Sequence, residues 1–250
     1  MSAIWSAIID PGEVIGPING SGFRLVESQE IVATTEIVPD LYDQTLLEEM
    51  LDSSKPAYRD GTSDLHYLLS TPFRYPPLAH GSRFGSRFEP SLFYGGTTEY
   101  VTLCESAFYR FFFLLDNVNG PLHEKLQTQH TLFEFEYATE TGVQLQQPPF
   151  TENEQQLRNP VSYDETQALG AAMRQDGVAC FEYASARDPA AGTNVALFEP
   201  EALDCTRPLS ETPCLCQTDK NEVIFSFMKS PVRFPLAQFM VNGDFPLPAK

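Results

Sequence analysis

Proline and glycine recur between residues 71 and 90, so this part of the chain is expected to be a loop rather than a long helix or strand. The Pro76-Pro77 pair is followed by Gly81 and Gly85 within the same stretch. Patterns typical of helices or strands occur before and after this stretch. The sequence therefore predicts a loop of some length between ordered elements.

This loop region also has an unusual charge pattern. The chain has 34 Asp and Glu against 16 Lys and Arg, a net charge of -18, yet residues 65–88 contain no acid. Because arginine matches phosphate oxygens with paired donors, the window predicts an anion site. Arg74 and Arg83 have aromatic neighbours that should anchor the loop, and they are the candidates for a phosphate clamp. Arg87, close to Glu89, is expected to be solvated.

Composition limits the class of protein. With 250 residues, 42% hydrophobic and 20% charged, the chain is expected to be a soluble, cytoplasmic domain. No apolar run reaches the roughly 20 residues of a membrane helix, and no basic segment precedes the first apolar residues as in a secretory signal. Five irregularly spaced cysteines indicate no disulfide framework. The acidic balance disfavours direct contact with nucleic acid. No membrane partner is expected either, because a long apolar run is missing.

Periodicity predicts a single α+β domain with flanking helices. Helices are expected over 41–51, 98–115 and 164–174, the last opened by a capping box at Ser162 and Glu165. A strand or helix end is expected at 65–70, and strands at 91–94, 132–139, 178–185, 194–200 and 222–228. Residues 1–64 are interpreted as a partly helical N-terminal extension and 65–250 as the catalytic unit, with both in one compact body.

Glu105 is the first candidate for chemistry. On the predicted helix it lies beside the apolar stripe of Val101, Phe108 and Phe112, where its carboxylate would be partly desolvated. An ordinary explanation exists as well, since Thr102 and Glu105 fit a capping box. Residues alone do not choose between the two.

Two further residues gain meaning only from their positions. Tyr94 precedes two glycines, where a bound ring could approach the backbone, although a core tyrosine is equally consistent. Ser185 ends a predicted strand and on its own indicates nothing. No metal site is expected, because His123 and His130 are seven residues apart and Cys214 and Cys216 have no second pair.

The chain resembles the RES-domain family, named for Arg, Glu and Ser positions, over roughly residues 68–200. The resemblance rests on an ordered series of segments: Pro72-Phe73-Arg74-Tyr75-Pro76-Pro77, Gly81-Ser82-Arg83-Phe84-Gly85, Ser91-Leu92-Phe93-Tyr94-Gly95-Gly96, Glu105-Ser106-Ala107-Phe108-Tyr109-Arg110, Tyr183-Ala184-Ser185-Ala186-Arg187 and Gly192-Thr193-Asn194-Val195-Ala196-Leu197-Phe198. The order of these segments is more specific than any one of them.

The resemblance implies an ADP-ribosyltransferase-like fold, with a twisted β core split around an NAD cleft. It also implies a toxin of a toxin–antitoxin pair that destroys NAD by hydrolysis or phosphorolysis. NAD would be the substrate, with inorganic phosphate as a candidate co-substrate and no resident cofactor. A cognate antitoxin protein is the expected partner, and a homo-oligomer is left open.

The same resemblance assigns roles to individual residues. Arg74 and Arg83 would hold the phosphates, and Glu105 would be the acidic catalyst. The residues expected to bind NAD are Tyr75, Tyr94, Ser185 and Asn194. The acid-rich segment 1–64 is not required by the family motif.

Two other functions compete with NAD destruction. An ADP-ribosyltransferase that modifies a macromolecule would usually carry Glu or Gln two residues before its catalytic Glu, and Leu103 stands there instead. A non-catalytic binding module would use Glu105 only as a helix cap and the arginines only to hold loops.

Overall fold

The longest strand of the protein, β3 (Lys125–Gln144), is the axis of the fold. The computed structural model describes residues 2–8, 11–28, 40–115, 125–227 and 230–247. The other strands are β1 (Gly16–Glu27), β2 (Phe93–Gly96), β4 (Cys180–Ala184), β5 (Thr193–Leu197), β6 (Ser210–Asp219), β7 (Glu222–Ser226) and β8 (Pro231–Pro235). The α-helices are α1 (Ala3–Ser6), α2 (Leu41–Ser54), α3 (Tyr67–Arg74), α4 (Glu99–Leu115), α5 (Glu154–Leu157) and α6 (Asp164–Gln175).

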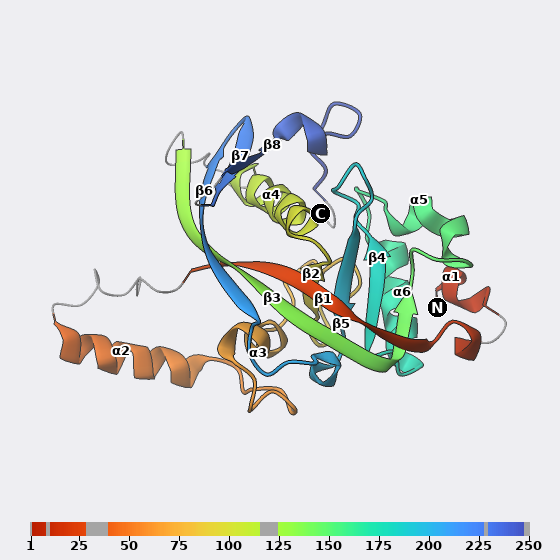
Figure 1. The fold of residues 1–250 in the computed structure, drawn as a ribbon, viewed down its shortest axis with the longest axis horizontal. Coiled ribbons are helices and arrows are strands. Elements are labelled where there is room, and N and C mark those ends of the chain that lie inside the picture. Colours follow the sequence, from red (N-terminus) through yellow and green to blue (C-terminus); the bar gives the residue numbers. More distant parts are fainter. Residues whose placement is uncertain (1, 9–10, 29–39, 116–124, 228–229, 248–250) are drawn as a thin grey trace.

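The strands form one mixed sheet in the order β1-β2-β5-β4-β3-β6-β7-β8, and β1 also pairs with β3. Strands β1, β2, β5, β4 and β3 therefore close into a ring, while β6, β7 and β8 continue from the other part of β3 (Figure 1). Among the described strands the β3–β4 pairing is parallel and the other pairings are antiparallel. Mixed strands with flanking helices confirm the expected α+β class.

The alternating pattern of 132–139 explains how β3 is built. Phe133, Phe135 and Tyr137 are buried, whereas Glu136 between them is exposed. This is the period-two pattern of a strand with one face in the core. The strand extends beyond the predicted segment at both ends and pairs with β1 from His130 to Gly142.

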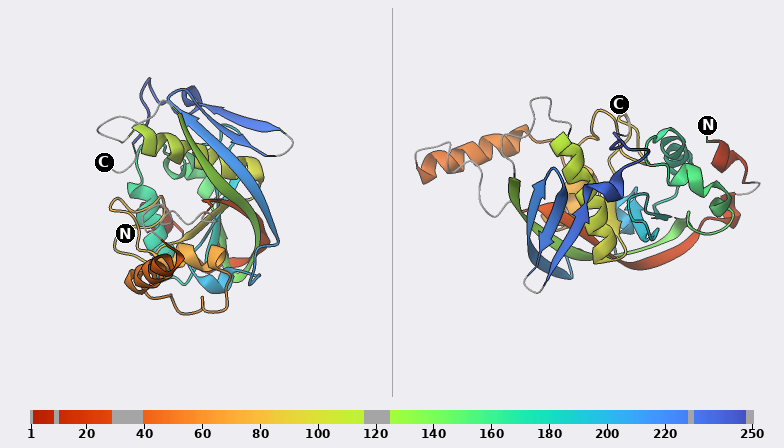
Figure 2. Two further views of the ribbon diagram at one scale, coloured as in Figure 1. Left: turned by 90° about the vertical axis from the view of Figure 1, so that its left-hand side faces the viewer. Right: turned by 90° about the horizontal axis from the view of Figure 1, so that it is seen from above.

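Helix α4 confirms the helix expected over 98–115. Its apolar side packs against the β6–β8 part of the sheet through Leu103, Phe108 and Phe111, in one cluster with Phe225 and Phe234. Figure 2 shows α4 lying across that part of the sheet. The opposite side of the helix is left to line a cavity.

Neither the capping box expected at Ser162 and Glu165 nor the alternative one at Thr102 and Glu105 is formed. Helix α4 begins at Glu99, so Thr102 lies inside it and its Oγ1 donates to the carbonyl of Thr98 at 3.0 Å. At α6 the N-cap is Tyr163, and the Ser162 hydroxyl instead donates to Asp164 at 3.0 Å. The capping explanation for Glu105 is therefore wrong.

The N-terminal part of the chain contributes to the sheet. Strand β1 pairs with β3 along its length, whereas the sequence analysis described residues 1–64 only as a partly helical extension. Helix α2 projects from the rest of the molecule in both figures, with Tyr42, Leu46 and Met50 exposed (Figures 1 and 2). The division at residue 64 stays a prediction.

Two strands, β6 and β8, were not predicted from the sequence. Residues 65–70, for which a strand or a helix end was expected, belong mainly to helix α3.

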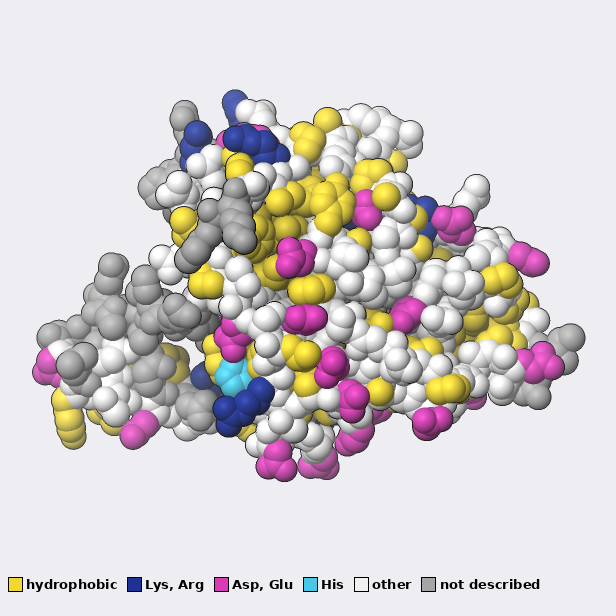
Figure 3. All heavy atoms as spheres, viewed as in Figure 1, with side chains coloured by type: hydrophobic (Ala, Val, Ile, Leu, Met, Phe, Trp, Pro, Cys, Tyr) yellow, Lys and Arg dark blue, Asp and Glu magenta, His cyan; other side chains and the backbone are white. Residues whose placement is uncertain are grey.

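The surface carries the charge that the sequence predicts. Acidic side chains are scattered over the face drawn in Figure 3, and basic ones are few there. Among the residues that the structure describes, no helix has both the length and the apolar character needed to cross a membrane.

Helix α6 packs unusually close to the loop after α3, and this contact supplies a test. A Cβ added at Gly170 would lie 1.9 Å from the carbonyl oxygen of Phe84. We expect Gly170→Ala to lower the free energy of unfolding by about 1–3 kcal/mol, because overpacking outweighs the better helix propensity of alanine. Denaturant unfolding measures this loss.

The matched control is Gly16→Ala, where an added Cβ meets no atom within 4 Å. We expect it to change the stability by less than about 0.5 kcal/mol. Equal stability of the two variants would show that the close approach of α6 does not constrain the loop.

Candidate active site

A cavity of ≈ 670 Å³ opens between α4, β1 and the loop that follows α3. Its wall includes five of the seven residues that the sequence singled out: Tyr75, Arg83, Tyr94, Glu105 and Asn194. Arg74 and Ser185 are not in the wall. The structure thus brings most of the predicted site together, and the two exceptions have structural explanations.

Glu105 is held by donors from the sheet. Its Oε1 accepts a hydrogen bond from Ser185 Oγ at 2.5 Å and another from Asn194 Nδ2 at 2.8 Å. Ser185 is fully buried and Asn194 is 1% exposed, so both donors are fixed by the core. The carboxylate of Glu105 is therefore oriented before any ligand binds. Ser185 acts on the cavity through Glu105 rather than by lining it.

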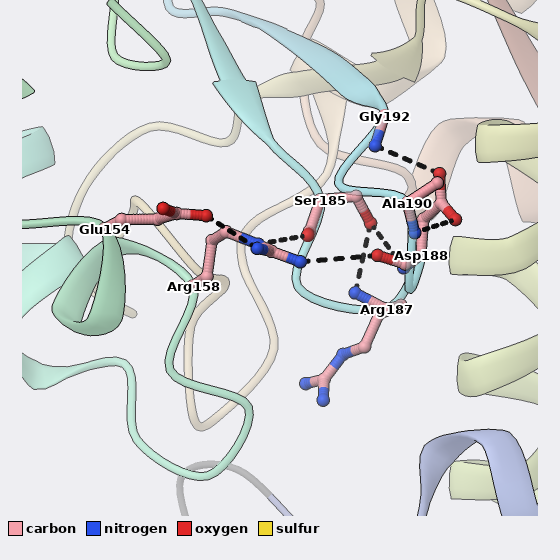
Figure 4. Close-up of polar contacts among 7 residues, drawn as sticks. All are labelled: Glu154, Arg158, Ser185, Arg187, Asp188, Ala190 and Gly192. Carbon is pink, nitrogen blue, oxygen red and sulfur yellow. Dashed lines mark hydrogen bonds and ion pairs between the residues drawn. The ribbon is translucent and has the colours of Figure 1, made fainter. Parts of the chain in front are cut away.

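The loop after β4 fixes Ser185 in turn (Figure 4). Its Oγ accepts the backbone N–H groups of Arg187 and Asp188, at 3.1 and 3.0 Å. The Asp188 carboxylate accepts the N–H groups of Ala190 and Gly192, both at 3.0 Å. From outside the loop, the Arg158 guanidinium donates to the Ser185 carbonyl at 2.9 Å. Backbone donors thus close the loop on itself and hold the hydroxyl.

Arg83 is the buried cation of the cavity, 6% exposed. Its Nη1 donates to the Asn159 carbonyl at 3.0 Å and to that of Leu157 at 3.3 Å, and the guanidinium lies 4.8 Å from the ring centroid of Tyr163. Its Nη2 is buried and has no hydrogen-bond partner among the described residues. One half of the guanidinium is therefore anchored while the other retains an unused donor.

Arg24 on β1 is a second cation in the wall that the sequence reasoning missed. Its Nη1 donates to the Tyr94 carbonyl at 2.5 Å, and its Nε is buried without a partner in the part of the chain that the structure describes. Burial lowers the pKa of the guanidinium to about 10, which leaves it charged at neutral pH. The one sequence signal for Arg24 is its position in the segment FRLV, which lies in β1 and precedes the family motif.

Tyr94 links the cavity to the loop after α3. Its hydroxyl is 2.9 Å from Ser82 Oγ and accepts the backbone N–H of Phe84 at 3.2 Å. Burial raises the pKa of Tyr94 to about 12, opposed by these hydrogen bonds, so the phenol is neutral. Burial also raises the pKa values of Tyr109 and Tyr183, two further phenols in the wall.

Arg74 lies at the end of α3 and turns away from the cavity. Its Nε donates to the Pro56 carbonyl at 2.6 Å, and its guanidinium lies 4.0 Å from the ring centroid of Tyr58. Arg87 is exposed beside Phe88, as expected. The aromatic neighbours of Arg74 in the sequence therefore indicated an anchored side chain but not the direction in which it points.

The cavity is suited to an anion and a developing cation in one ligand. The guanidinium groups of Arg24 and Arg83 in the wall supply positive charge for phosphate oxygens, and a fixed carboxylate can stabilise positive charge. Within the described residues, no group of three or more His, Cys, Asp or Glu is arranged to hold a metal ion.

The RES domain family model matches residues 56–217, which is more than half of the chain. The chain therefore belongs to the RES-domain family, which is associated with NAD-related toxin activity and suggests an enzyme that acts on NAD. A comparison with curated proteins found no match.

The buried hydroxyl behind Glu105 yields a stability prediction. Ser185→Ala removes one donor to the carboxylate and leaves two backbone N–H groups in the loop without their acceptor. We expect a loss of about 1–3 kcal/mol in the free energy of unfolding, because unsatisfied buried groups carry their desolvation cost. Denaturant unfolding of Ser185→Ala is compared with Ser210→Ala, whose exposed hydroxyl donates to Glu134 Oε2 at 3.2 Å. Identical midpoints for the two variants would contradict the role given to Ser185.

Proposed function

We propose that this protein degrades NAD by cleaving the bond between nicotinamide and ribose, using phosphate or water as the nucleophile. The observation that carries the proposal is the shared cavity of Glu105 and two guanidinium groups, each with a buried nitrogen that lacks a partner among the described residues. A ligand with both phosphates and a cationic reacting centre satisfies all three groups, and NAD is such a ligand.

Glu105 is proposed to stabilise the reacting sugar. As the C1′–N bond breaks, its electron pair neutralises the pyridinium ring and positive charge develops on the ribose. A carboxylate already fixed by Ser185 and Asn194 favours that charge without reorganising. An oxygen of phosphate or water then bonds to C1′, and water also loses a proton. Nicotinamide leaves as a neutral ring and needs no general acid.

Arg83 and Arg24 are proposed to hold the phosphates. Each guanidinium is partly anchored to backbone carbonyls, so the remaining donor is presented with little loss of side-chain freedom. Tyr94 is proposed to contact the nicotinamide or its ribose, with Tyr75 and Asn194 in the same wall. Arg74, outside the wall, is not needed for this arrangement.

An ADP-ribosyltransferase that modifies a macromolecule is the second candidate. Its acceptor-steering residue would stand at Leu103, which is 2% exposed and packs in the apolar cluster of α4. A buried leucine cannot orient an acceptor. This observation favours attack by a small nucleophile.

The biological role proposed is that of a toxin in the cytoplasm, controlled by a cognate antitoxin protein. The support is family membership. The excess of acidic side chains suits a basic partner surface, and nothing in the proposal requires contact with nucleic acid.

Product analysis tests the reaction. We expect purified protein to convert NAD to nicotinamide and either ADP-ribose or its 1″-phosphate, and reactions with and without phosphate identify the nucleophile by chromatography. Glu105→Gln keeps an acceptor oxygen for Ser185 and Asn194 but removes the charge, so we expect a rate loss of about 10²–10³ with little change in stability. Intact NAD with folded, inhibitor-free protein under both conditions would overturn the proposal, and label transfer to a macromolecule would favour the transferase.

Arg83 gives a second test of the phosphate role. Arg83→Lys keeps the positive charge but cannot both bond to the Asn159 and Leu157 carbonyls and offer a second planar donor. We expect KM for NAD, or for phosphate, to rise about tenfold to a hundredfold, the equivalent of one charge-assisted hydrogen bond. Arg87→Lys, the same change on the exposed part of this loop, should leave the kinetics unaltered. Equal kinetics of both variants would remove Arg83 from the site.

A further inference from the structure

The cavity continues well past Glu105. Helix α4 and strand β1 run side by side. The Thr102 hydroxyl, shared with the Thr98 carbonyl, lies 3.0 Å from the Phe23 carbonyl oxygen, and Arg110 Nη1 lies 3.3 Å from Glu27 Oε2. The eight helical steps between the two contacts advance about 12 Å at 1.5 Å each, and the four strand steps advance about 13 Å at 3.3 Å each. Glu105, Arg110 and Glu27 all belong to the wall. The site thus has a second end, one to two helical turns from the reacting carboxylate.

The second end contains a cation covered by a carboxylate. The Arg110 side chain is 15% exposed, and its Nη2 donates to Thr128 Oγ1 at 3.0 Å. The Glu27 side chain is 61% exposed and lies against Nη1. His130 contacts the same Thr128 hydroxyl at 2.8 Å, and burial followed by the charge of Arg110 lowers the pKa of its imidazole. The accessible charge at this end is therefore that of Glu27.

An exposed aromatic ring belongs to the same part of α4 as Arg110. Phe113 follows Arg110 by three residues, so both project from the same side of α4. Its side chain is 58% exposed and belongs to the cavity wall. An exposed aromatic face beside a carboxylate and a guanidinium suits a nucleobase and its ribose.

We propose that Glu27, Arg110 and Phe113 form an adenosine site and that Glu27 selects a free ribose 2′-hydroxyl over a 2′-phosphate. The inference rests on the proposed function, because a dinucleotide with its nicotinamide end at Glu105 must extend into the rest of the cavity. A carboxylate accepts a hydrogen bond from the hydroxyl and repels a phosphate, whereas an arginine accommodates the phosphate. In this protein the carboxylate covers the arginine. The enzyme therefore prefers NAD to NADP, and removal of the Glu27 charge shifts the preference toward NADP.

The test is Glu27→Gln, which keeps the size of the side chain but removes the negative charge that lies against Arg110. We expect kcat/KM for NADP, relative to that for NAD, to rise at least tenfold over the parent. The double variant Glu27→Gln with Arg110→Gln should lose this gain, because the guanidinium that would bind the 2′-phosphate is gone. Glu140→Gln makes the same change in net charge at an exposed position of β3 outside the cavity, and it should leave the ratio unaltered.

A binding experiment separates this inference from the proposed reaction. Calorimetry with 5′-AMP and adenosine 2′,5′-bisphosphate should show that the parent binds the bisphosphate more weakly than 5′-AMP. In Glu27→Gln the affinity for the bisphosphate, relative to that for 5′-AMP, should rise at least tenfold. If NAD is cleaved but neither ratio changes in Glu27→Gln, the adenosine site is overturned and the reaction stands. If the nucleotides bind with this selectivity but NAD stays intact, the reaction is overturned and the adenosine site stands. If neither nucleotide binds, the inference is overturned.

Discussion

The fixed carboxylate of Glu105 is the interaction on which the rest of the site depends. Ser185 follows strand β4, and Asn194 is the second residue of the neighbouring strand β5. Both side chains donate to the same oxygen of Glu105 on α4. Helix and sheet are thereby locked together at the point where they enclose the cavity. Within the described residues these donors use Oε1 alone, which leaves the other oxygen of Glu105 for a ligand.

The electrostatics of the cavity differ from those of the whole chain. A net charge of -18 repels phosphates at long range, so anion binding has to come from cations at short range. Arg83 and Arg24 meet this need because protein walls surround them, where a guanidinium interacts with a phosphate more strongly than in water. An acidic chain can thus contain a cavity whose wall suits an anion. It also explains why a count of charges along the sequence says little about this site.

Sequence reasoning recovered the elements with clear periodicity and the residues inside the family motif. Helix α4 and the alternating part of β3 follow from local pattern, and Glu105, Arg83, Tyr94 and Asn194 converge as expected. Arg74 was misplaced as a cavity cation because flanking aromatics reveal anchoring but not direction. Arg24 was missed because β1 lacks alternation and joins the site only through long-range pairing with β3, which no local window contains.

That long-range pairing has a consequence for where the functional unit begins. The family match starts at residue 56, yet β1, which ends at Glu27, closes the strand ring and supplies one side of the cavity. A fragment cut at the match boundary would have an unpaired edge along β3 and a cavity open on one side. The folded unit that encloses the cavity is therefore larger than the family match, because a strand that precedes the matched residues completes it.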